Sequence, residues 1–193
     1  MKIIKERADV MPALTEVFRT YGYEGASLAL IGRHTGLGKG SLYHFFPGGK
    51  EEMAAGVLDG IDGWFHAHVF EPLRRDADPV HAIEAMFAAT DHYFRSGERV
   101  CIVGVFALGD VRDRFAKRIN AYFSVWRDAL TAALRGLGKD DAMAREEAEN
   151  IVAGIQGALV AARALNDPAL FGRRLAAMKA AVLPGRTSVP EGS

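Results

Sequence analysis

The sequence predicts an all-α protein of about nine helices. Apolar residues recur at spacings of three, four and seven along almost the whole chain, which is typical of helices that bury one face. Glycine and proline interrupt this pattern where helices are expected to end. The segment from Val100 to Leu108 is rich in Val and resembles a strand. No second segment offers it a partner strand, so we expect a helix there as well.

The composition fits an ordinary protein of one large or two small domains. The chain has 193 residues and a formal net charge of zero, which argues against a bulk binder of polyanions. Cys101 is the single cysteine and excludes an intrachain disulfide framework. No apolar run reaches the roughly 18 residues of a membrane span, and the first ten residues lack the apolar core of a signal peptide. We therefore expect a cytoplasmic protein that does not enter the membrane.

The first helix is expected between Ile3 and Tyr21, where apolar residues follow one helix face. Pro12 lies inside this run and should either kink the helix or mark its first turn, because proline cannot donate a backbone hydrogen bond. Gly22 and Gly25 should end the helix.

Two short helices should follow, separated by a glycine-containing turn. Ser27 is a suitable N-cap for a helix over 28–35, and Gly36 should end that helix. Gly38 is a weaker N-cap for a helix over 39–46.

A strong stop, Pro47-Gly48-Gly49, precedes a fourth helix that opens at Lys50. Later helices are marked by an Asp-Pro pair or by long apolar periodicity. Their expected ranges are Asp78-Pro79 to about Ser96, Asp110 to Leu134, Asp141 to Leu165, and Asp167-Pro168 to Leu183. The polar end of the chain, 185–193, is expected to be disordered.

Residues 27–50 carry the main functional signal. Two short helices joined by a tight turn form the geometry of a helix-turn-helix that reads DNA. An apolar inner side leaves Lys39, Ser41, Tyr43 and His44 on the outer side, where each can donate to phosphates or base edges. Gly40 would let the backbone approach a duplex closely, and the helix that opens at Lys50 could offer free backbone amides to a phosphate.

These segments resemble the N-terminal domain of TetR-family regulators. The resemblance lies in Tyr21-Gly22-Tyr23-Glu24-Gly25-Ala26-Ser27-Leu28 and in Thr35-Gly36-Leu37-Gly38-Lys39-Gly40-Ser41-Leu42-Tyr43. The stretch Phe46 to Glu52 is similar to the LmrA/YxaF-like branch of that family. Three positions depart from the family pattern. Gly32 replaces an alanine, Gly38 replaces a small polar cap, and the family histidine is Phe45, with His44 one place earlier.

The resemblance implies a ligand-responsive transcriptional regulator, with a repressor released from its operator by a small molecule as the commoner arrangement. It implies a helix-turn-helix DNA-binding domain over 1–48 and a helical ligand-binding and dimerisation domain over 49–184. The DNA contacts it implies are Ser27, Lys39, Gly40, Ser41, Tyr43, His44 and Lys50, with Tyr43 and Lys50 on phosphates. The partners are a palindromic double-stranded operator, an unidentified effector and a second copy of the chain.

Other interpretations of the sequence stay open at this point. Aromatic residues are first of all core, but we expect some to line the ligand pocket: Trp64, Phe87, Phe106 and Trp126. The histidine spacings predict no metal site, and no motif predicts a cofactor or a catalytic nucleophile, so we do not expect an enzyme. The alternative is a helical small-molecule-binding protein or an enzyme that does not bind DNA.

Overall fold

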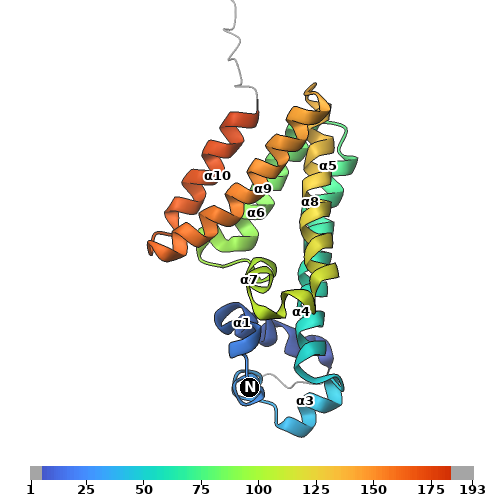
Figure 1. The fold of residues 1–193 in the computed structure, drawn as a ribbon, viewed down its shortest axis with the longest axis vertical. Coiled ribbons are helices and arrows are strands. Elements are labelled where there is room, and N and C mark those ends of the chain that lie inside the picture. The colour runs from blue at the N-terminus through green and yellow to red at the C-terminus, as the bar shows by residue number, and fades with distance from the viewer. Residues whose placement is uncertain (1–5, 184–193) are drawn as a thin grey trace, which may run out of the picture. The chain divides into compact units, whose positions relative to one another are not determined.

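The computed structural model describes residues 6–183 and confirms an all-α fold (Figure 1). Within these residues the backbone forms the helices α1 to α10 and no strand. The chain stays helical without a break from α4 through a π turn into α5, so it contains nine separate α-helices in the described part. It divides into two compact units, Met1–His68 with Arg99–Trp126, and Val69–Glu98 with Arg127–Ser193. Each unit is described by itself.

The first unit begins with the three helices that the sequence predicted, α1 (Arg7–Gly25), α2 (Leu28–Thr35) and α3 (Lys39–Phe45). Pro12 lies inside α1, and the helix continues through it. The predicted apolar face is buried in its core, with Val10, Leu14, Val17 and Phe18 at 0% exposure. Ile3, with which the predicted run began, lies outside the described residues.

The end of α1 depends on a glycine. Gly22 has φ 64° and ψ −173°, the only non-helical backbone angles inside this element. This combination belongs to a region that side-chain-bearing residues scarcely populate. Gly22 therefore redirects the last residues of α1 towards Ser27 and the start of α2.

The predicted caps of α2 are confirmed. The Ser27 side chain accepts a hydrogen bond from the backbone N–H of Leu30 at 3.2 Å. Gly36 follows α2 with φ 72°, a left-handed conformation that favours glycine. Gly38 caps α3 with its backbone alone, without a side-chain hydrogen bond.

The helix after the Pro-Gly-Gly stop is α4 (Gly49–Phe65), one residue longer at its start than predicted. The π turn His66–Phe70 leads from it into α5 (Glu71–Arg75), and no sequence signal predicted this turn. The Val-rich segment forms α7 (Ile102–Leu108), so the expected helix is confirmed there. The buried Cys101 caps α7, because its Sγ accepts from the backbone N–H of Gly104 at 3.4 Å.

The expected helix from Asp110 to Leu134 is wrong at its start. Asp110–Asp113 is a short 3-10 turn, and α8 covers Ala116–Gly136. A contact from far along the chain is made at this turn. The Glu24 carboxylate at the end of α1 accepts a hydrogen bond from the backbone N–H of Val111 at 3.1 Å. That hydrogen bond joins the turn ahead of α8 to the end of α1.

The second unit contains α6 (Pro79–Phe94), the 3-10 turn η2 (Arg95–Gly97), α9 (Asp141–Ala164) and α10 (Ala169–Val182). Asp78 caps α6 as predicted, because its side chain accepts from the backbone N–H groups of Val80 and His81. Helices α9 and α10 lie side by side (Figure 1). Gly154 of α9 lies at this contact, where an added Cβ would lie 2.7 Å from Sδ of the flexible Met178 side chain and would displace it.

The division of the chain into 1–48 and 49–184 stays a prediction. The first compact unit contains the first of these segments together with α4, α7 and the first half of α8. The expected disordered tail, 185–193, lies outside the described residues. No helix in the described part of the chain is long and apolar enough to cross a membrane.

Candidate nucleic-acid interface and a second cavity

The turn between α2 and α3 is held by Thr35, whose side chain is 6% exposed. Its Oγ1 donates to the carbonyl of Ile31 at 2.8 Å and accepts from the backbone N–H of Leu37 at 3.3 Å. A buried hydroxyl that is satisfied on both sides stabilises one conformation of the turn. The direction of α3 is therefore fixed relative to α2.

Gly32 explains one departure from the expected family pattern. A Cβ at this position would lie 2.9 Å from the carbonyl oxygen of Leu37, closer than real Cβ contacts. The backbone of the turn passes directly over α2 here. The alanine that the resemblance leads one to expect at position 32 does not fit this turn without a shift of its backbone.

The outer side of α3 carries the polar residues that the sequence predicted there. Leu42 points inward and is 1% exposed, and Ile31 and Phe46 add 0% exposed side chains to the same core. The exposed residues of α3 are Lys39, Gly40, Ser41, Tyr43 and His44. One face of a short helix thus presents donors to solvent while the other anchors the helix.

A groove beside α3 brings together three of the predicted DNA contacts. We call it the interface groove; it is lined by Tyr23, Ser27, Leu28, Tyr43, Pro47, Gly48, Gly49, Lys50, Glu51 and Arg114. Ser27, Tyr43 and Lys50 are the predicted residues in this set. Lys39, Gly40, Ser41 and His44 lie on α3 outside the lining. The groove therefore contains Tyr43 and Lys50, the two residues expected to meet phosphates, together with Ser27, whereas the other predicted contacts lie on the exposed helix face.

Tyr43 rests against the start of α4. A Cβ added at Gly49, whose φ is 66°, would lie 3.5 Å from Cε1 and 3.8 Å from the hydroxyl oxygen of Tyr43. The ring thus packs over bare backbone, and Tyr43 stays 40% exposed. This packing positions the hydroxyl at the edge of the interface groove, where it can donate to a phosphate oxygen.

Lys50 already has partners within the protein. Its Nζ donates to the carbonyl oxygen of Tyr23 at 2.9 Å and lies 4.2 Å from the centroid of the Tyr23 ring. Burial raises the pKa of the Tyr23 phenol above its ordinary value, so the ring is neutral and the contact is a cation–π interaction. The Lys50 ammonium is held at the groove. It has three N–H donors, so the hydrogen bond to Tyr23 leaves others available to a phosphate.

Arg114 lines the interface groove but was not predicted from the sequence. Its Nη1 donates to Oε2 of Glu51 at 2.7 Å, and this hydrogen bond raises the pKa of the guanidinium. Arg114 precedes α8 and stands 63 residues from its partner, outside every motif of the helix-turn-helix. No local signal identifies it, and only the fold brings it into the interface groove.

The amides at the start of α4 are less free than expected. The N–H of Gly48 donates to Oε2 of Glu52 at 2.8 Å, and the N–H of Gly49 donates to the carbonyl of Phe46 at 2.9 Å. Glu52 also accepts from Nη1 of Arg7 at 2.6 Å. A phosphate that used these two amides would have to displace existing partners, so side chains are the better donors in this groove.

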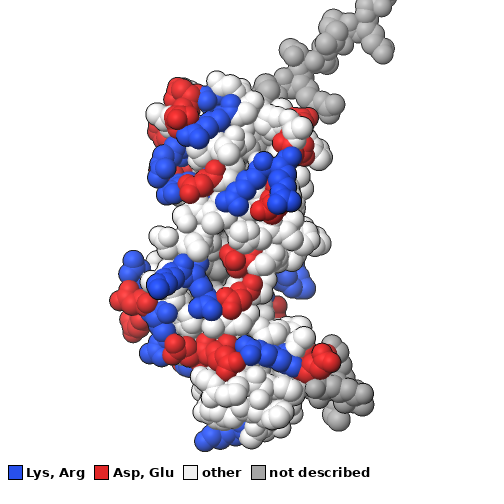
Figure 2. Space-filling model, turned by 90° about the vertical axis from the view of Figure 1, so that its right-hand side faces the viewer, with Lys and Arg blue, Asp and Glu red and all other residues white. Residues whose placement is uncertain are grey.

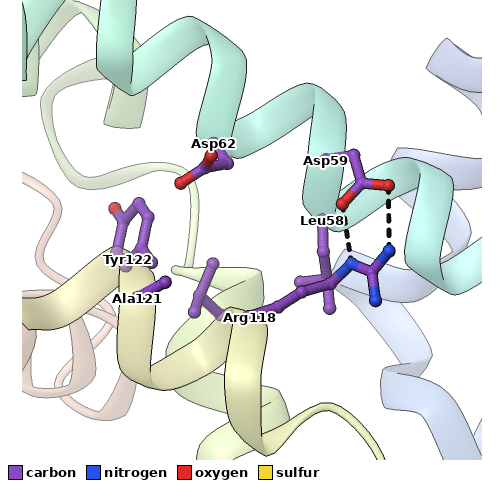
Figure 3. Close-up of a pocket in the computed structure, with 7 residues that line it drawn as sticks. Leu58, Asp59, Asp62, Arg118, Ala121 and Tyr122 are labelled. Atoms are coloured by element: carbon purple, nitrogen blue, oxygen red, sulfur yellow. Dashed lines mark hydrogen bonds and ion pairs between the residues drawn. The ribbon is translucent and has the colours of Figure 1, made fainter. Parts of the chain in front are cut away.

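A second cavity lies between α4, α7 and α8 in the same unit (Figure 3). It has a volume of about 80 Å³ and is lined by Leu58, Asp59, Asp62, Val103, Arg118, Ala121 and Tyr122. This volume is smaller than that of a typical drug-sized site, roughly 300 Å³ or more, and suits a compact molecule of a few non-hydrogen atoms. Three of its lining residues belong to α4, the helix whose first turn lines the interface groove.

The four aromatic residues predicted for a ligand pocket are not among this lining. Trp126 and Phe106 are 0% exposed and Phe87 is 4% exposed, as core residues are. Trp64 stacks on His68, with ring centroids 4.5 Å apart. Their assignment to a pocket stays a prediction. Within residues 6–183 no group of three or more His, Cys, Asp or Glu side chains is placed to hold a metal ion.

Two family models match the chain. Residues 11–57 match "Bacterial regulatory proteins, tetR family", and residues 79–174 match "Transcriptional regulator LmrA/YxaF-like, C-terminal domain". The first covers the helix-turn-helix and the start of α4. The second covers most of α6 to α10.

Individual proteins agree with these matches. The chain is 25% identical to the HTH-type transcriptional regulator LmrA of Bacillus subtilis, over 80% of this chain and 84% of that protein. It is 31% identical to the regulator YxaF of the same organism, over 49% of each protein. A TetR-family regulator from Agrobacterium tumefaciens has the same fold, with a TM-score of 0.77, 22% identity and coverage of 92% of this chain and 97% of that one.

Proposed function

This chain belongs to the TetR family of DNA-binding transcriptional regulators, in its LmrA/YxaF-like branch, and we propose that it is a cytoplasmic, homodimeric repressor that a small molecule releases from its operator. It acts by binding and not by catalysis. The observation that carries the DNA-binding role is the exposed polar face of α3 beside the interface groove. In a dimer, two such helices enter successive major grooves about 34 Å apart.

We assign two kinds of DNA contact. Ser27, Tyr43 and Lys50 line the interface groove and are assigned to phosphates, which set position and register. Lys39 and His44 are exposed on α3 and are assigned to base edges, which carry sequence information. Gly40 and Ser41 lie between them and let the helix approach the duplex closely.

The exposed side of α9 supports the dimer. Met143, Val160 and Leu165 remain 57%, 62% and 67% exposed in the single chain, although they are apolar. Ala153 and Gly157 are also exposed on this helix and would allow a close approach. A second copy of α9 and α10 would cover this surface as a four-helix interface.

Helix α4 supports the ligand response. Its first turn lines the interface groove, whereas Leu58, Asp59 and Asp62 farther along it line the second cavity. A ligand that binds more tightly to one tilt of this helix shifts the population of that tilt, and with it the position of the groove.

The test is a genomic selection of fragments bound by the purified protein, followed by operator titration with Tyr43→Phe. We expect an enriched palindrome and about ten-fold weaker binding by the variant, because a hydrogen bond to a charged phosphate is lost. Tyr21→Phe is the matched control, since Tyr21 is an exposed tyrosine of the same unit outside the groove. No enrichment at low salt by folded protein, or equal affinities for the two variants, would contradict the proposal.

A further inference from the structure

The charged residues around the second cavity are not equally available to a ligand. Asp59 and Arg118 form a bidentate pair, with Nε to Oδ1 at 2.6 Å and Nη2 to Oδ2 at 3.2 Å. This fork geometry satisfies both carboxylate oxygens of Asp59 and directs two guanidinium donors to one partner. The opposite charges of Asp59 and Arg118 therefore largely cancel, and the pair adds little net charge to the cavity.

Asp62 has a weaker partner. Its carboxylate lies 3.6 Å from Nε2 of His66, beyond ordinary hydrogen-bond distance, and both side chains are about two-fifths exposed at 43% and 39%. Asp62 is one turn along α4 from Asp59 and lines the same cavity. It therefore contributes a negative charge that no arginine of the lining offsets.

Figure 3 shows the carboxylate of Asp62 and the hydroxyl of Tyr122 on one side of the cavity, away from the Asp59–Arg118 pair. The Tyr122 side chain is 1% exposed and comes from α8, so it is held firmly by its surroundings. Leu58, Val103 and Ala121 supply apolar surface between these polar groups. The cavity thus has one acidic polar end and an apolar body.

We propose that this cavity binds a small organic cation, with an amine beside Asp62 and Tyr122 and a compact apolar group against Leu58 and Val103. An ammonium donates a charge-assisted hydrogen bond to the carboxylate of Asp62, and the buried Tyr122 ring forms the adjacent wall of the cavity. An anion of the same size meets the Asp62 charge, and the one cation of the lining is already paired. The inference rests on the ligand-responsive function proposed above and names the chemical class of its effector.

The experiment uses three probes that share one ring and differ in charge: phenethylamine, 2-phenylethanol and phenylacetate. Their affinities for the full-length protein are measured by calorimetry or by ligand-observed NMR, without DNA. We expect the amine to bind about ten-fold more tightly than the alcohol, and phenylacetate to bind most weakly. Equal or tighter binding of phenylacetate would overturn the proposal, as would no binding of any probe at millimolar concentration.

Two variants assign the binding to this cavity. Asp62→Asn should remove the preference for the amine over the alcohol, whereas Asp113→Asn, an 89% exposed carboxylate of the same unit outside the lining, should retain it. If Asp62→Asn does not fold by circular dichroism, Asp62→Ser takes its place and should likewise remove the preference for the amine. Equal amine affinities for the cavity variant and for Asp113→Asn would overturn the assignment.

Operator affinity is measured separately, in the absence of any amine. A failure of the cavity proposal can therefore be distinguished from a failure of the DNA-binding role. A protein that binds its operator but none of the amines contradicts the cavity proposal alone. A protein that shows the Asp62-dependent amine preference but binds no operator supports the cavity and contradicts the DNA-binding role.

Discussion

Gly40 shows how one residue can point to a partner outside the chain. It is the exposed second residue of α3, and a Cβ at this position would meet nothing within 4 Å. Gly32 on α2 is different, because the turn leaves no space for a Cβ there. The fold therefore needs glycine at position 32 but not at position 40. A glycine that the fold does not need is consistent with close approach of another molecule to α3.

Gly40→Ala is expected to change stability and DNA affinity in opposite directions. Alanine should stabilise the helix by up to about 1 kcal/mol relative to glycine. Its methyl group should also hold the backbone away from the duplex and weaken operator binding about ten-fold, a cost near 1.4 kcal/mol. Urea denaturation and operator titration measure the two effects separately.

Gly60→Ala is the matched control for this experiment. Gly60 is also helical and exposed, lies on α4 in the same unit, and a Cβ added there would have no neighbour within 4 Å. It should gain similar stability without any loss of operator affinity. A loss of affinity in Gly60→Ala, or none in Gly40→Ala, would contradict a role of position 40 in contact with DNA.

Among the elements, those with local signals were predicted well. Ser27 caps α2 and Asp78 caps α6, because each side chain bonds to backbone only two or three residues away. The π turn before α5 and the 3-10 turn before α8 were not predicted. The second of these contacts Glu24, 87 residues from Val111, and no periodicity within either segment contains that contact.

The first turn of α6 predicts a pH effect. His81 Nδ1 lies 2.5 Å from Oδ2 of Asp76, and this hydrogen bond raises the pKa of His81 above its ordinary 6.5. The same bond lowers the pKa of Asp76 below its ordinary 3.8. The His81 contribution to stability is therefore fully present below pH 6.5 and is lost as the pH rises through the folded pKa. The Asp76 contribution is present above pH 3.8 and is lost as the pH falls through its folded value.

NMR titration of the His81 ring checks this expectation. Asp76→Asn should lower the pKa of His81 towards 6.5 and flatten the fall in unfolding free energy as the pH rises above that value. Asp91→Asn removes a carboxylate from the other end of α6 and should leave the His81 titration unchanged. An unshifted His81 pKa in the native protein would show that the ion pair does not persist in solution.

At the scale of the whole molecule, the sequence identified the helix-turn-helix but not the complete groove beside it. Ser27, Tyr43 and Lys50 were predicted from a motif of consecutive residues, and all three line the groove. Arg114 was missed, and Lys50 was not expected to lie over Tyr23. Such contacts join distant parts of the chain and follow from the packing of several helices. Figure 2 shows acidic and basic side chains interspersed on one face, consistent with a net charge of zero.

Val160→Asp is expected to separate the proposed dimer. Val160 is 62% exposed on α9, and a carboxylate there would be buried without a partner in the four-helix interface. Light scattering should give twice 20.9 kDa for the native protein and 20.9 kDa for the variant. Leu108→Asp, at an 88% exposed apolar residue of the first unit, is the control and should keep the dimer mass. A native protein that is already monomeric at micromolar concentration would rule out this interface.

The backbone of Gly22 has a consequence for how this gene tolerates mutation. Its φ of 64° and ψ of −173° suit glycine alone, even though a Cβ added there would find its nearest neighbour, Cγ1 of Val105, at an ordinary 3.7 Å. Every single-nucleotide change that alters a glycine codon adds a side chain or a stop. In a library of random point mutations selected for DNA binding, codon 22 should therefore retain synonymous changes almost exclusively, whereas the codon of the unhindered Gly60 should accept alanine and serine freely.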